Sequence, residues 1–315
     1  MNRQKKVAVI GTGFVGASVA ADLMSTRACG EIVMLNRGFG KAWAEAEDLC
    51  HGLGYSPDAV KVYAGDYKDA ADADLAVISA AVAYTPGVSD RLLVLHKNYA
   101  IMQDVVPRLM ETGFSGVVFV VSNPVDMMSW AVWKLSELPA SRVIGSGTLL
   151  DSSRLKYFLT EYLPAYAPNE IDACTLGEHG ESQFIPWSVC TVHGKPVLEL
   201  LRERNIAIDT EALLKKVKDA PIEVIANKGP ITFGIGASCG MALRSILLDE
   251  RRVYPVSVML NGAYGQDDIF AGVPALLGAE GVLDILEYRL TEAEQEAFDR
   301  SCDVIRQNCA ALDLN

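Results

Sequence analysis

One histidine of this sequence has neighbours that suit acid/base chemistry. His179 lies in the stretch T-L-G-E-H-G-E-S, flanked by two glycines and two glutamates, directly after a predicted strand. An imidazole has an ordinary pKa close to neutral pH, so it can give and take a proton there. The residue types alone leave three roles open for this histidine: an acid/base catalyst, a metal ligand or a buried structural side chain.

A predicted helix start, L-L-D-S-S-R-L-K-Y-F-L, offers two charged side chains for such chemistry. Asp151 and Arg154 are three residues apart, so they share one face of the helix. An aspartate in a first turn commonly caps the helix or interacts with its dipole. The alternative is that Asp151 holds His179 in one tautomer while Arg154 binds a carboxylate with its two-pronged guanidinium. The spacing fits both interpretations.

A glycine-rich loop near the N-terminus has the pattern of a dinucleotide site. Gly11, Gly13 and Gly16, with Phe14 and Val15 between the last two, follow a predicted strand and open a helix. Without side chains at the glycines, a pyrophosphate can approach the backbone N–H groups of the helix start. The order of strand, loop and helix favours a dinucleotide over a purely structural turn.

The position that discriminates NAD from NADP departs from the usual pattern. The motif expects an acid about 20 residues further on, at the end of the second strand, to hold a ribose hydroxyl. This sequence has Asn36 there, followed by Arg37. Loss of the carboxylate removes repulsion toward a 2′-phosphate, and the adjacent guanidinium can bind one. The alternative is that Asn36 still bonds the ribose while Arg37 faces water. We expect NAD or NADP, with a slight preference for NADP.

Composition and charge argue against several classes of protein. Half of the 315 residues are hydrophobic, enough for two domains of ordinary size. The 28 basic and 40 acidic residues give a net charge of −12, which disfavours nucleic acid as a partner. No stretch has the pattern of a signal peptide or a membrane span, so we expect a cytoplasmic protein without a membrane partner. The seven scattered cysteines lack a C-x-x-C pair and fit reduced, buried thiols better than disulfides or a metal site.

The first half of the chain alternates short apolar runs with helical segments. The apolar runs, such as K-V-A-V-I, E-I-V-M-L and G-V-V-F-V-V, are unbroken rather than alternating. This pattern indicates parallel strands covered by helices on both faces. The sequence therefore predicts an α/β fold whose first part, residues 1–147, is a Rossmann doubly wound parallel sheet that binds the dinucleotide.

The second half, residues 148–315, has a different order of predicted helices and strands. A strand is predicted over 253–260, and two paired extended stretches turn at H-G-K-P. Helices are predicted over 152–162, over 210–227, after a Gly-rich start near residue 229, and over 291–309. This mixture predicts an α+β substrate and catalytic domain packed directly on the first, with the active site at their junction.

Four stretches, in chain order, resemble the L-lactate dehydrogenase branch of the lactate/malate dehydrogenase family. They are V-A-V-I-G-T-G-F-V-G-A-S, the block from V-S-N-P-V-D to L-D-S-S-R-L-K-Y-F-L, G-E-H-G-E-S-Q-F-I-P-W-S, and P-V-S-V-M-L-N-G-A-Y-G-Q-D-D-I-F-A-G-V-P. The resemblance covers nearly the whole chain. It implies an oxidoreductase that transfers a hydride between a nicotinamide cofactor and a 2-oxo or L-2-hydroxy monocarboxylic acid.

The resemblance implies a role for each of five residues. His179 matches the proton donor and acceptor, and Asp151 matches the aspartate that pairs with it. Arg154 matches the arginine that binds the substrate carboxylate. Asn123, in S-N-P-V-D, matches an asparagine near the reacting oxygen and is also expected to contact the cofactor. Arg91 matches a carbonyl-polarising arginine on a mobile loop, whose closure would exclude water.

Two departures from the family pattern bear on the substrate's side chain. The selector stands two residues before Pro-Gly, as glutamine in lactate enzymes and arginine in malate enzymes, and is Tyr84 here. One extra residue in this loop also allows Ala83 or Thr85 to fill the position. Ile231 stands where lactate enzymes have threonine. We expect a 2-oxo acid with an uncharged, apolar side chain, which can be bulky or aromatic. Pyruvate is also compatible with the sequence. The alternative is that Tyr84 faces outward and selects nothing.

The resemblance also bears on regulation and assembly. Allosteric bacterial members bind fructose 1,6-bisphosphate through an arginine and a histidine, at positions that here are Lys156 and Asp172. Because an aspartate repels a bisphosphate, we expect no such activation. Family members are usually tetramers or dimers, so we expect a homotetramer or homodimer.

Two other functions compete with this prediction. A malate dehydrogenase would bury a second substrate carboxylate, which costs several kcal/mol when no cation accompanies it. A non-catalytic dinucleotide-sensing protein on the same fold would keep the glycines. It would have no reason to keep His179, Asp151, Arg154 and Arg91 together.

Overall fold

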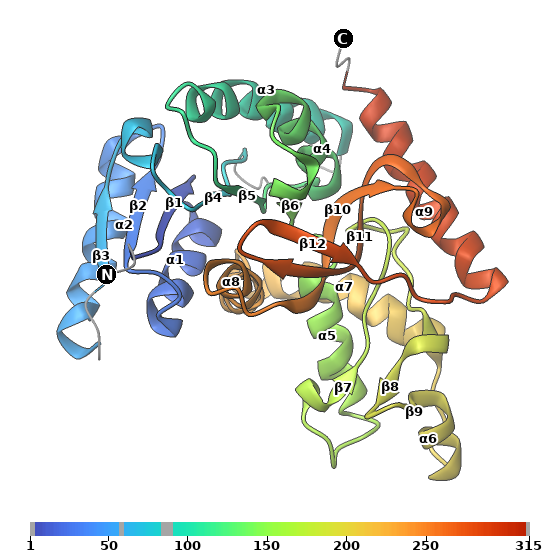
Figure 1. Cartoon of the computed structure of the whole chain (residues 1–315). Helices are drawn as coiled ribbons and strands as arrows, with labels where there is room; N and C mark the ends of the chain where they lie inside the picture. Colours follow the sequence, from blue (N-terminus) through green and yellow to red (C-terminus); the bar gives the residue numbers. More distant parts are fainter. Residues whose placement is uncertain (1–3, 57–59, 83–90, 313–315) are drawn as a thin grey trace.

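One mixed sheet forms the centre of the molecule (Figure 1). The computed structural model describes residues 4–56, 60–82 and 91–312. Residues 91–93 are described by their backbone alone. Within the described residues, nine strands join the sheet in the order β12-β11-β10-β6-β5-β4-β1-β2-β3. They are β1 Lys6–Ile10, β2 Glu31–Leu35, β3 Lys61–Ala64, β4 Leu75–Ile78, β5 Val117–Val120, β6 Val143–Gly145, β10 Arg252–Asn261, β11 Asp267–Gly278 and β12 Gly281–Ile285.

Helices cover this sheet from both sides, as Figure 1 shows. The α-helices are α1 Phe14–Thr26, α2 Phe39–His51, α3 Arg91–Met110, α4 Val125–Ser136, α5 Leu149–Leu159, α6 Val197–Glu203, α7 Thr210–Lys228, α8 Phe233–Leu247 and α9 Glu292–Ala310. Helices α3 and α4 pack on each other on one side of the sheet, and α1 packs on α8 on the other. In the part of the chain that the structure describes, no helix is both long and apolar enough to cross a membrane.

The first six strands run parallel in the order β3-β2-β1-β4-β5-β6. Every residue of β1, β4 and β5 is buried, because both faces of these strands lie under helices. The order reverses direction between β1 and β4, which creates a crevice at the carboxyl ends of the strands. The predicted Rossmann doubly wound sheet is confirmed.

The second half of the chain extends the same sheet. Strand β10 runs antiparallel to β6 and pairs with it where Ser257 faces Gly145. A Cβ on Gly145 would lie 2.9 Å from Cβ of Ser257 and 2.3 Å from Oγ of Ser129, so only glycine fits this approach. The predicted mixed α+β second part is confirmed. Its division from the first part after residue 147 falls between β6 and α5 and stays a prediction.

A smaller unit projects from the sheet at the lower right of Figure 1. Its strands β7 Ile171–Asp172, β8 Thr191–Val192 and β9 Lys195–Pro196 form a separate antiparallel sheet. Leu155 and Leu159 of α5 share a second apolar core with Val197, Leu201 and Val217 of the helices around it. The extended stretch predicted to turn at H-G-K-P ends there, because α6 already begins at Val197.

Candidate active site

A cavity of about 500 Å³ lies at the carboxyl edge of the parallel strands. Its lining includes residues that follow three neighbouring strands: Ser79 after β4, Asn123 after β5 and Gly147 after β6. The loop that carries His179 and the first turns of α5 close it from the other half of the chain. The cavity thus lies where the sequence predicted the active site.

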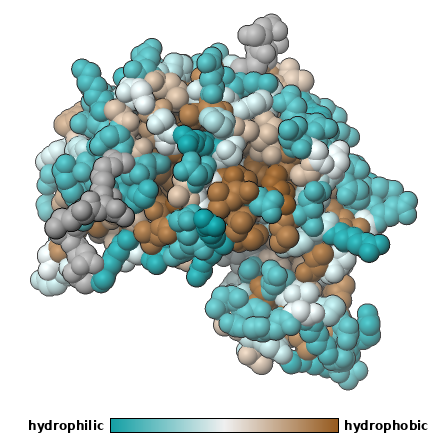
Figure 2. Space-filling view, viewed as in Figure 1, coloured by the Kyte–Doolittle hydropathy of each residue, from teal (hydrophilic) through white to brown (hydrophobic). Residues whose placement is uncertain are grey.

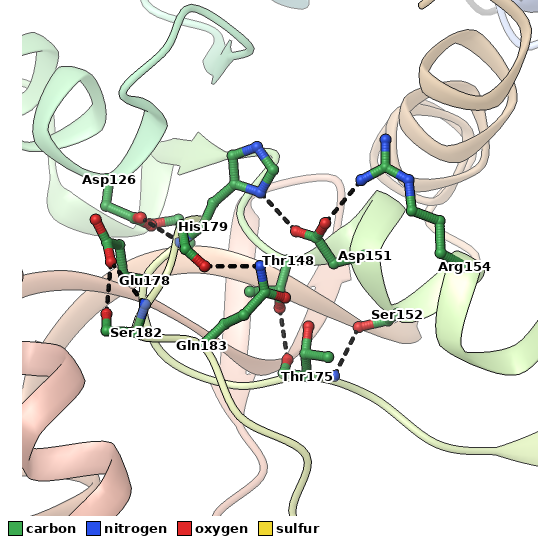
Figure 3. Close-up of polar contacts among 12 residues, drawn as sticks. Asp126, Thr148, Asp151, Ser152, Arg154, Thr175, Glu178, His179, Ser182 and Gln183 are labelled. Atoms are coloured by element: carbon green, nitrogen blue, oxygen red, sulfur yellow. Dashed lines mark hydrogen bonds and ion pairs between the residues drawn. The ribbon is translucent and has the colours of Figure 1, made fainter. Parts of the chain in front are cut away.

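Figure 3 shows His179 and Arg154 on opposite sides of the Asp151 carboxylate. Nδ1 of His179 lies 2.5 Å from Oδ2 of Asp151, and Nη1 of Arg154 donates to Oδ1 at 2.7 Å. Asp151 is 1% exposed, whereas both of its partners line the cavity. The structure therefore brings these three residues together, from the start of α5 and from a loop 28 residues away from Asp151.

The charges of this group change the pKa values of its members. Burial alone would lower the pKa of His179, but the charge and hydrogen bond of Asp151 raise it above its ordinary value. Burial alone would raise the pKa of Asp151, but His179 and Arg154 lower it below its ordinary value. The pair therefore favours a protonated imidazole beside an ionised carboxylate.

Hydrogen bonds from α5 hold the segment that leads to His179. Oγ of Ser152 accepts the Thr175 N–H at 3.0 Å, and Oγ1 of Thr148 donates to the Thr175 carbonyl at 2.6 Å. Both bonds are buried, so they fix this segment to the helix that carries Asp151 (Figure 3). These bonds therefore help to hold His179 at a fixed distance from Asp151.

A second carboxylate, which the sequence did not single out, contacts the backbone of His179. Oδ2 of Asp126 accepts the backbone N–H of His179 at 2.8 Å. Asp126 lies in the first turn of α4 and is 1% exposed. The sequence signal for Asp126 was its place in the N-P-V-D motif, in which the prediction named only Asn123.

Asn123 lines the cavity at the end of β5. Its carbonyl accepts a hydrogen bond from Nδ2 of Asn98 at 2.6 Å, and Oδ1 of Asn98 accepts the Val82 N–H at 2.8 Å. Asn98 therefore joins the segment after β4 to the segment after β5, a role that the sequence did not reveal. Arg91 is the first residue of α3, and only its backbone is described; Tyr84 lies outside the described residues.

The glycine motif lies between β1 and α1, and its Val15 lines the cavity. Gly11 has a φ of +99°, and a Cβ there would lie 2.5 Å from the Ala80 nitrogen. A Cβ on Gly16 would lie 2.1 Å from the Gly11 carbonyl oxygen, so packing requires both glycines. A Cβ on Gly13 would meet nothing within 4 Å, and α1 starts there without a side-chain cap. Free N–H groups beside open space fit a pyrophosphate.

The other residues predicted to bind the dinucleotide lie at the start of α1 and after β2. Val15 lines the cavity, and Phe14 begins α1 with 62% of its surface exposed. Asn36 follows β2, and its Nδ2 donates to Oγ1 of Thr12 at 3.1 Å. Arg37 is exposed and has no hydrogen bond or ion pair with any described residue. The guanidinium is therefore available to a ligand or to water.

An apolar wall lines the same cavity as His179 and Arg154. We define this wall as Leu150, Pro221, Ile225, Pro230 and Ile231. Pro221 and Ile225 are one helical turn apart on α7, so they present one face to the cavity. The sequence identified Ile231 but missed the two residues of α7, although their spacing was a signal.

A separate polar cavity of about 320 Å³ contains both Lys156 and Asp172. His193 and Glu170 also line it, with Nε2 of His193 2.6 Å from Oε2 of Glu170. Two carboxylates in so small a site oppose the binding of an anion. Among all described residues, no group of three His, Cys, Asp or Glu side chains is placed to hold a metal ion.

The chain matches two family models along its length. The lactate/malate dehydrogenase NAD binding domain matches residues 5–145, and the lactate/malate dehydrogenase alpha/beta C-terminal domain matches residues 148–312. The chain belongs to the lactate/malate dehydrogenase family. The resemblance expected from the sequence is confirmed, and this member of the family is a lactate dehydrogenase-like oxidoreductase with an NAD-binding domain.

Curated members of the family that resemble this chain are L-lactate dehydrogenases. The chain is 43% identical over 305 residues to L-lactate dehydrogenase 3 of Bacillus thuringiensis subsp. konkukian, with 96% of each chain covered. It is 40% identical over 313 residues to L-lactate dehydrogenase 2 of Enterococcus faecalis, covering 99% of this chain and 98% of the relative. The minor L-lactate dehydrogenase from Enterococcus mundtii in its ligands-bound form matches with a TM-score of 0.94 and 36% identity, covering 99% of both chains.

Proposed function

We propose that this protein is an L-2-hydroxyacid dehydrogenase of the lactate type, which reduces a 2-oxo monocarboxylic acid to the L-2-hydroxy acid. The observation that carries the proposal is the Asp151 carboxylate shared between His179 and Arg154 at one cavity. An acid/base group and a carboxylate-binding group are thereby held side by side, as a small 2-oxo acid requires.

His179 has the role of proton donor in the direction of reduction. Its Nδ1 faces Asp151, so Nε2 is left to give a proton to the substrate oxygen. The ionised Asp151 stabilises the protonated ring and keeps Nδ1 as the donor to itself. When the reaction runs in reverse, the neutral ring takes the proton back. A bound nicotinamide would supply or accept the hydride.

Arg154 has the role of binding the substrate carboxylate. One N–H group of its guanidinium already donates to Asp151, which fixes the side chain in place. A guanidinium has five N–H groups, so two can still form a forked pair with a carboxylate. Asn123 has the role of holding the reacting oxygen and contacting the cofactor. Arg91 has the role of polarising the substrate carbonyl.

The apolar wall supports a substrate with an uncharged, apolar side chain, branched or aromatic ones included. None of its five side chains can accompany a second carboxylate, which disfavours oxaloacetate. Lys97 of α3 also lines the cavity, so malate dehydrogenase activity is the alternative that needs a direct test. Tyr84 is the proposed selector of the substrate's side chain and lies outside the described residues.

The cofactor is the second point to be tested. The family model that covers residues 5–145 supports NAD. The slight preference for NADP rests on Asn36 and Arg37 alone, and the comparisons give it no support. We keep it as a prediction because the Arg37 guanidinium has no partner among the described residues.

Steady-state kinetics test the substrate and the cofactor together. Pyruvate, 2-oxoisocaproate, phenylpyruvate and oxaloacetate are each assayed with NADH and with NADPH, and kcat/KM is compared. We expect turnover of the monocarboxylic acids and weak turnover of oxaloacetate. Oxaloacetate as the preferred substrate would overturn the lactate type, and absence of turnover with every acid would favour a dinucleotide-sensing protein.

Assembly into a homotetramer or homodimer is also part of the proposal. Figure 2 shows apolar residues gathered over the region where β10, β11 and β12 lie in Figure 1. Exposed side chains there include Val253, Leu283 and Leu286. Exposed apolar patches of this kind commonly mark protein interfaces. Light scattering at several concentrations measures the oligomeric state, and addition of fructose 1,6-bisphosphate is expected to change neither it nor the rate.

A further inference from the structure

We propose that Asp126 is a positioning residue for His179, which holds the backbone of the histidine by a hydrogen bond and adds a second carboxylate to its surroundings. This inference rests on the proposed function, because it concerns the acid/base residue of that reaction. It adds a second carboxylate, from α4, to the one that Asp151 supplies from α5. Figure 3 shows the two aspartates on either side of His179.

Both oxygens of the Asp126 carboxylate are used. Oδ2 accepts the backbone N–H of His179 at 2.8 Å, and Oδ1 accepts the hydroxyl of Ser257 at 2.6 Å. Ser257 lies in β10 and is fully buried, and Asp126 is 1% exposed. The carboxylate thus joins three parts of the fold that are far apart in sequence, namely α4, β10 and the loop of the histidine.

Asp126 also fixes His179 relative to Asn123. The two residues Asn123 and Asp126 are separated by one short turn at the start of α4, and Asn123 lines the cavity that His179 faces. A rigid connection between them holds both groups at fixed positions around a substrate oxygen. Positioning of this kind contributes to catalysis because a small displacement of an acid/base group lowers the reaction rate.

The charge of Asp126 acts on the ring of His179 in the same direction as Asp151. The charged groups that act on His179 are Asp151 and Arg154 of α5 and Asp126 of α4, and Lys97 of α3 lines the same cavity. Glu178, next to His179 in its loop, acts on Asp126 and raises the pKa of that carboxyl. The thiols Cys302 and Cys309 of α9 lie within the field of Asp126. The negative charge of Asp126 contributes to the raised pKa of His179.

Asp126 keeps this charge only above mildly acidic pH. Burial raises the pKa of Asp126 to about 6, although the hydrogen bonds from Ser257 and His179 oppose the increase. At neutral pH the carboxylate is therefore mostly ionised. Loss of the Ser257 hydroxyl would raise this pKa further, so the two residues are expected to act together.

The substitution Asp126→Asn separates the charge from the hydrogen bonds. The amide oxygen can still accept the His179 N–H, and the amide NH₂ can donate to Oγ of Ser257, which is able to accept. Size and hydrogen bonding are retained while the charge is lost. We expect the titration midpoint of the His179 ring to fall by about 0.5–1 pH unit.

NMR of the full-length protein labelled with ¹³C-histidine measures this midpoint directly. The chain has only four histidines, and the His179→Gln variant assigns the signal. The alkaline limb of 2-oxo acid reduction is expected to move to lower pH by the same amount, because reduction needs the protonated ring. The NMR measurement does not depend on turnover.

Ser301→Ala is the matched control. Oγ of Ser301 accepts the N–H of Glu178 at 2.8 Å, so it anchors the neighbouring backbone group without a charge. This variant is expected to lower the Tm and leave the His179 midpoint in place. If Asp126→Asn does not fold, Ser257→Ala is expected to lower the midpoint by a smaller amount, because it reduces the ionised fraction of Asp126.

An unmoved midpoint in Asp126→Asn, or in Ser257→Ala where that variant is used instead, would overturn this inference. A lowered Tm without a midpoint change would assign Asp126 a structural role alone. A lowered midpoint in a protein that reduces none of the 2-oxo acids would overturn the proposed function and retain the electrostatic role of Asp126. The two failures are therefore distinguishable.

Discussion

Oδ2 of Asp151 lies 2.5 Å from Nδ1 of His179. The aspartate is buried, while the histidine ring keeps 27% of its side-chain surface exposed and lines the cavity. One nitrogen of the ring is therefore occupied inside the protein, and the other is available to a substrate. The predictions for His179 and Asp151 follow from these different positions of the two ring nitrogens.

His179→Asn is expected to lower kcat by about 10²–10⁴-fold, the usual contribution of a general acid/base residue. Binding of NADH, followed by its fluorescence, should be retained because the predicted dinucleotide site is the glycine motif between β1 and α1, which does not include His179. His193→Asn is the control: that ring is 76% exposed and bonds Glu170 at the separate polar cavity. Turnover like the wild type in His179→Asn would contradict the role of this residue.

Asp151→Asn is expected to move the pH profile of reduction toward lower pH. Burial alone would lower the pKa of His179, and Asp151 raises it above its ordinary value of 6.5. Reduction needs the protonated ring, so activity persists above pH 6.5 and falls as pH rises through the raised pKa. Without the aspartate charge the fall begins earlier. An alkaline limb at the same pH in wild type and variant would refute the pairing.

The same Asp151→Asn substitution is expected to lower kcat. An amide can donate to Nδ1, which places the ring proton on the wrong nitrogen for the neutral form of His179. The loss should be about 10²-fold or more. Rates measured at the pH optimum of each enzyme separate this effect from the shift of the profile.

Arg154→Gln is expected to lower kcat/KM for 2-oxo acids by about 10²–10⁴-fold, because two hydrogen bonds between charged groups are lost. Arg154→Lys should recover only part of this loss, since a lysine cannot form the fork. Lys156→Gln is the control, because Lys156 lies on the same helix but lines the separate cavity. Equal loss in both variants would indicate a general effect on α5.

Ile231→Thr is expected to reduce the preference for 2-oxoisocaproate over pyruvate by about tenfold, the range typical of a changed apolar contact in a pocket. The ratio of kcat/KM values for the two acids measures it. Ile222→Thr on α7 serves as a control, because Ile222 is 64% exposed. If the ratio stays constant in Ile231→Thr, the apolar wall does not select the substrate.

Asn36→Asp is expected to increase the preference for NADH over NADPH at least about fivefold, because the new carboxylate repels a 2′-phosphate. Arg37→Ala should act in the same direction by removing an attractive charge. Lys41→Ala tests for a general charge effect, since Lys41 of α2 already pairs with Glu45. A cofactor ratio that neither Asn36→Asp nor Arg37→Ala changes would end the argument for NADP.

Local pattern was enough to predict most of the elements. The strands of the first half are unbroken apolar runs, because they are buried on both faces and no side chain there needs to be polar. Strand β11 was missed, since its sequence contains Gly272 and Pro274, which are uncommon in strands. It forms because β10 pairs with it along most of its length, with Pro255 opposite Pro274.

Residue chemistry was enough to name His179, Asp151 and Arg154 as candidates, and the family resemblance gave them roles and added Asn123 and Ile231. The neighbours that hold them could not be selected in this way. Asp126 and Ser257 are 131 residues apart, and Asn98 acts through backbone groups on two other segments. A carboxylate or an amide of this kind has no distinctive sequence pattern.

The sequence by itself determined the family, the parallel sheet and the residue types of the proposed reaction, because these depend on composition and order along the chain. Only the tertiary structure decided that His179 and Arg154 share one carboxylate, that α7 supplies part of the apolar wall, and that β10–β12 continue the first sheet. The physical reason is that hydrogen bonds and burial depend on distances in space between segments that are remote in sequence.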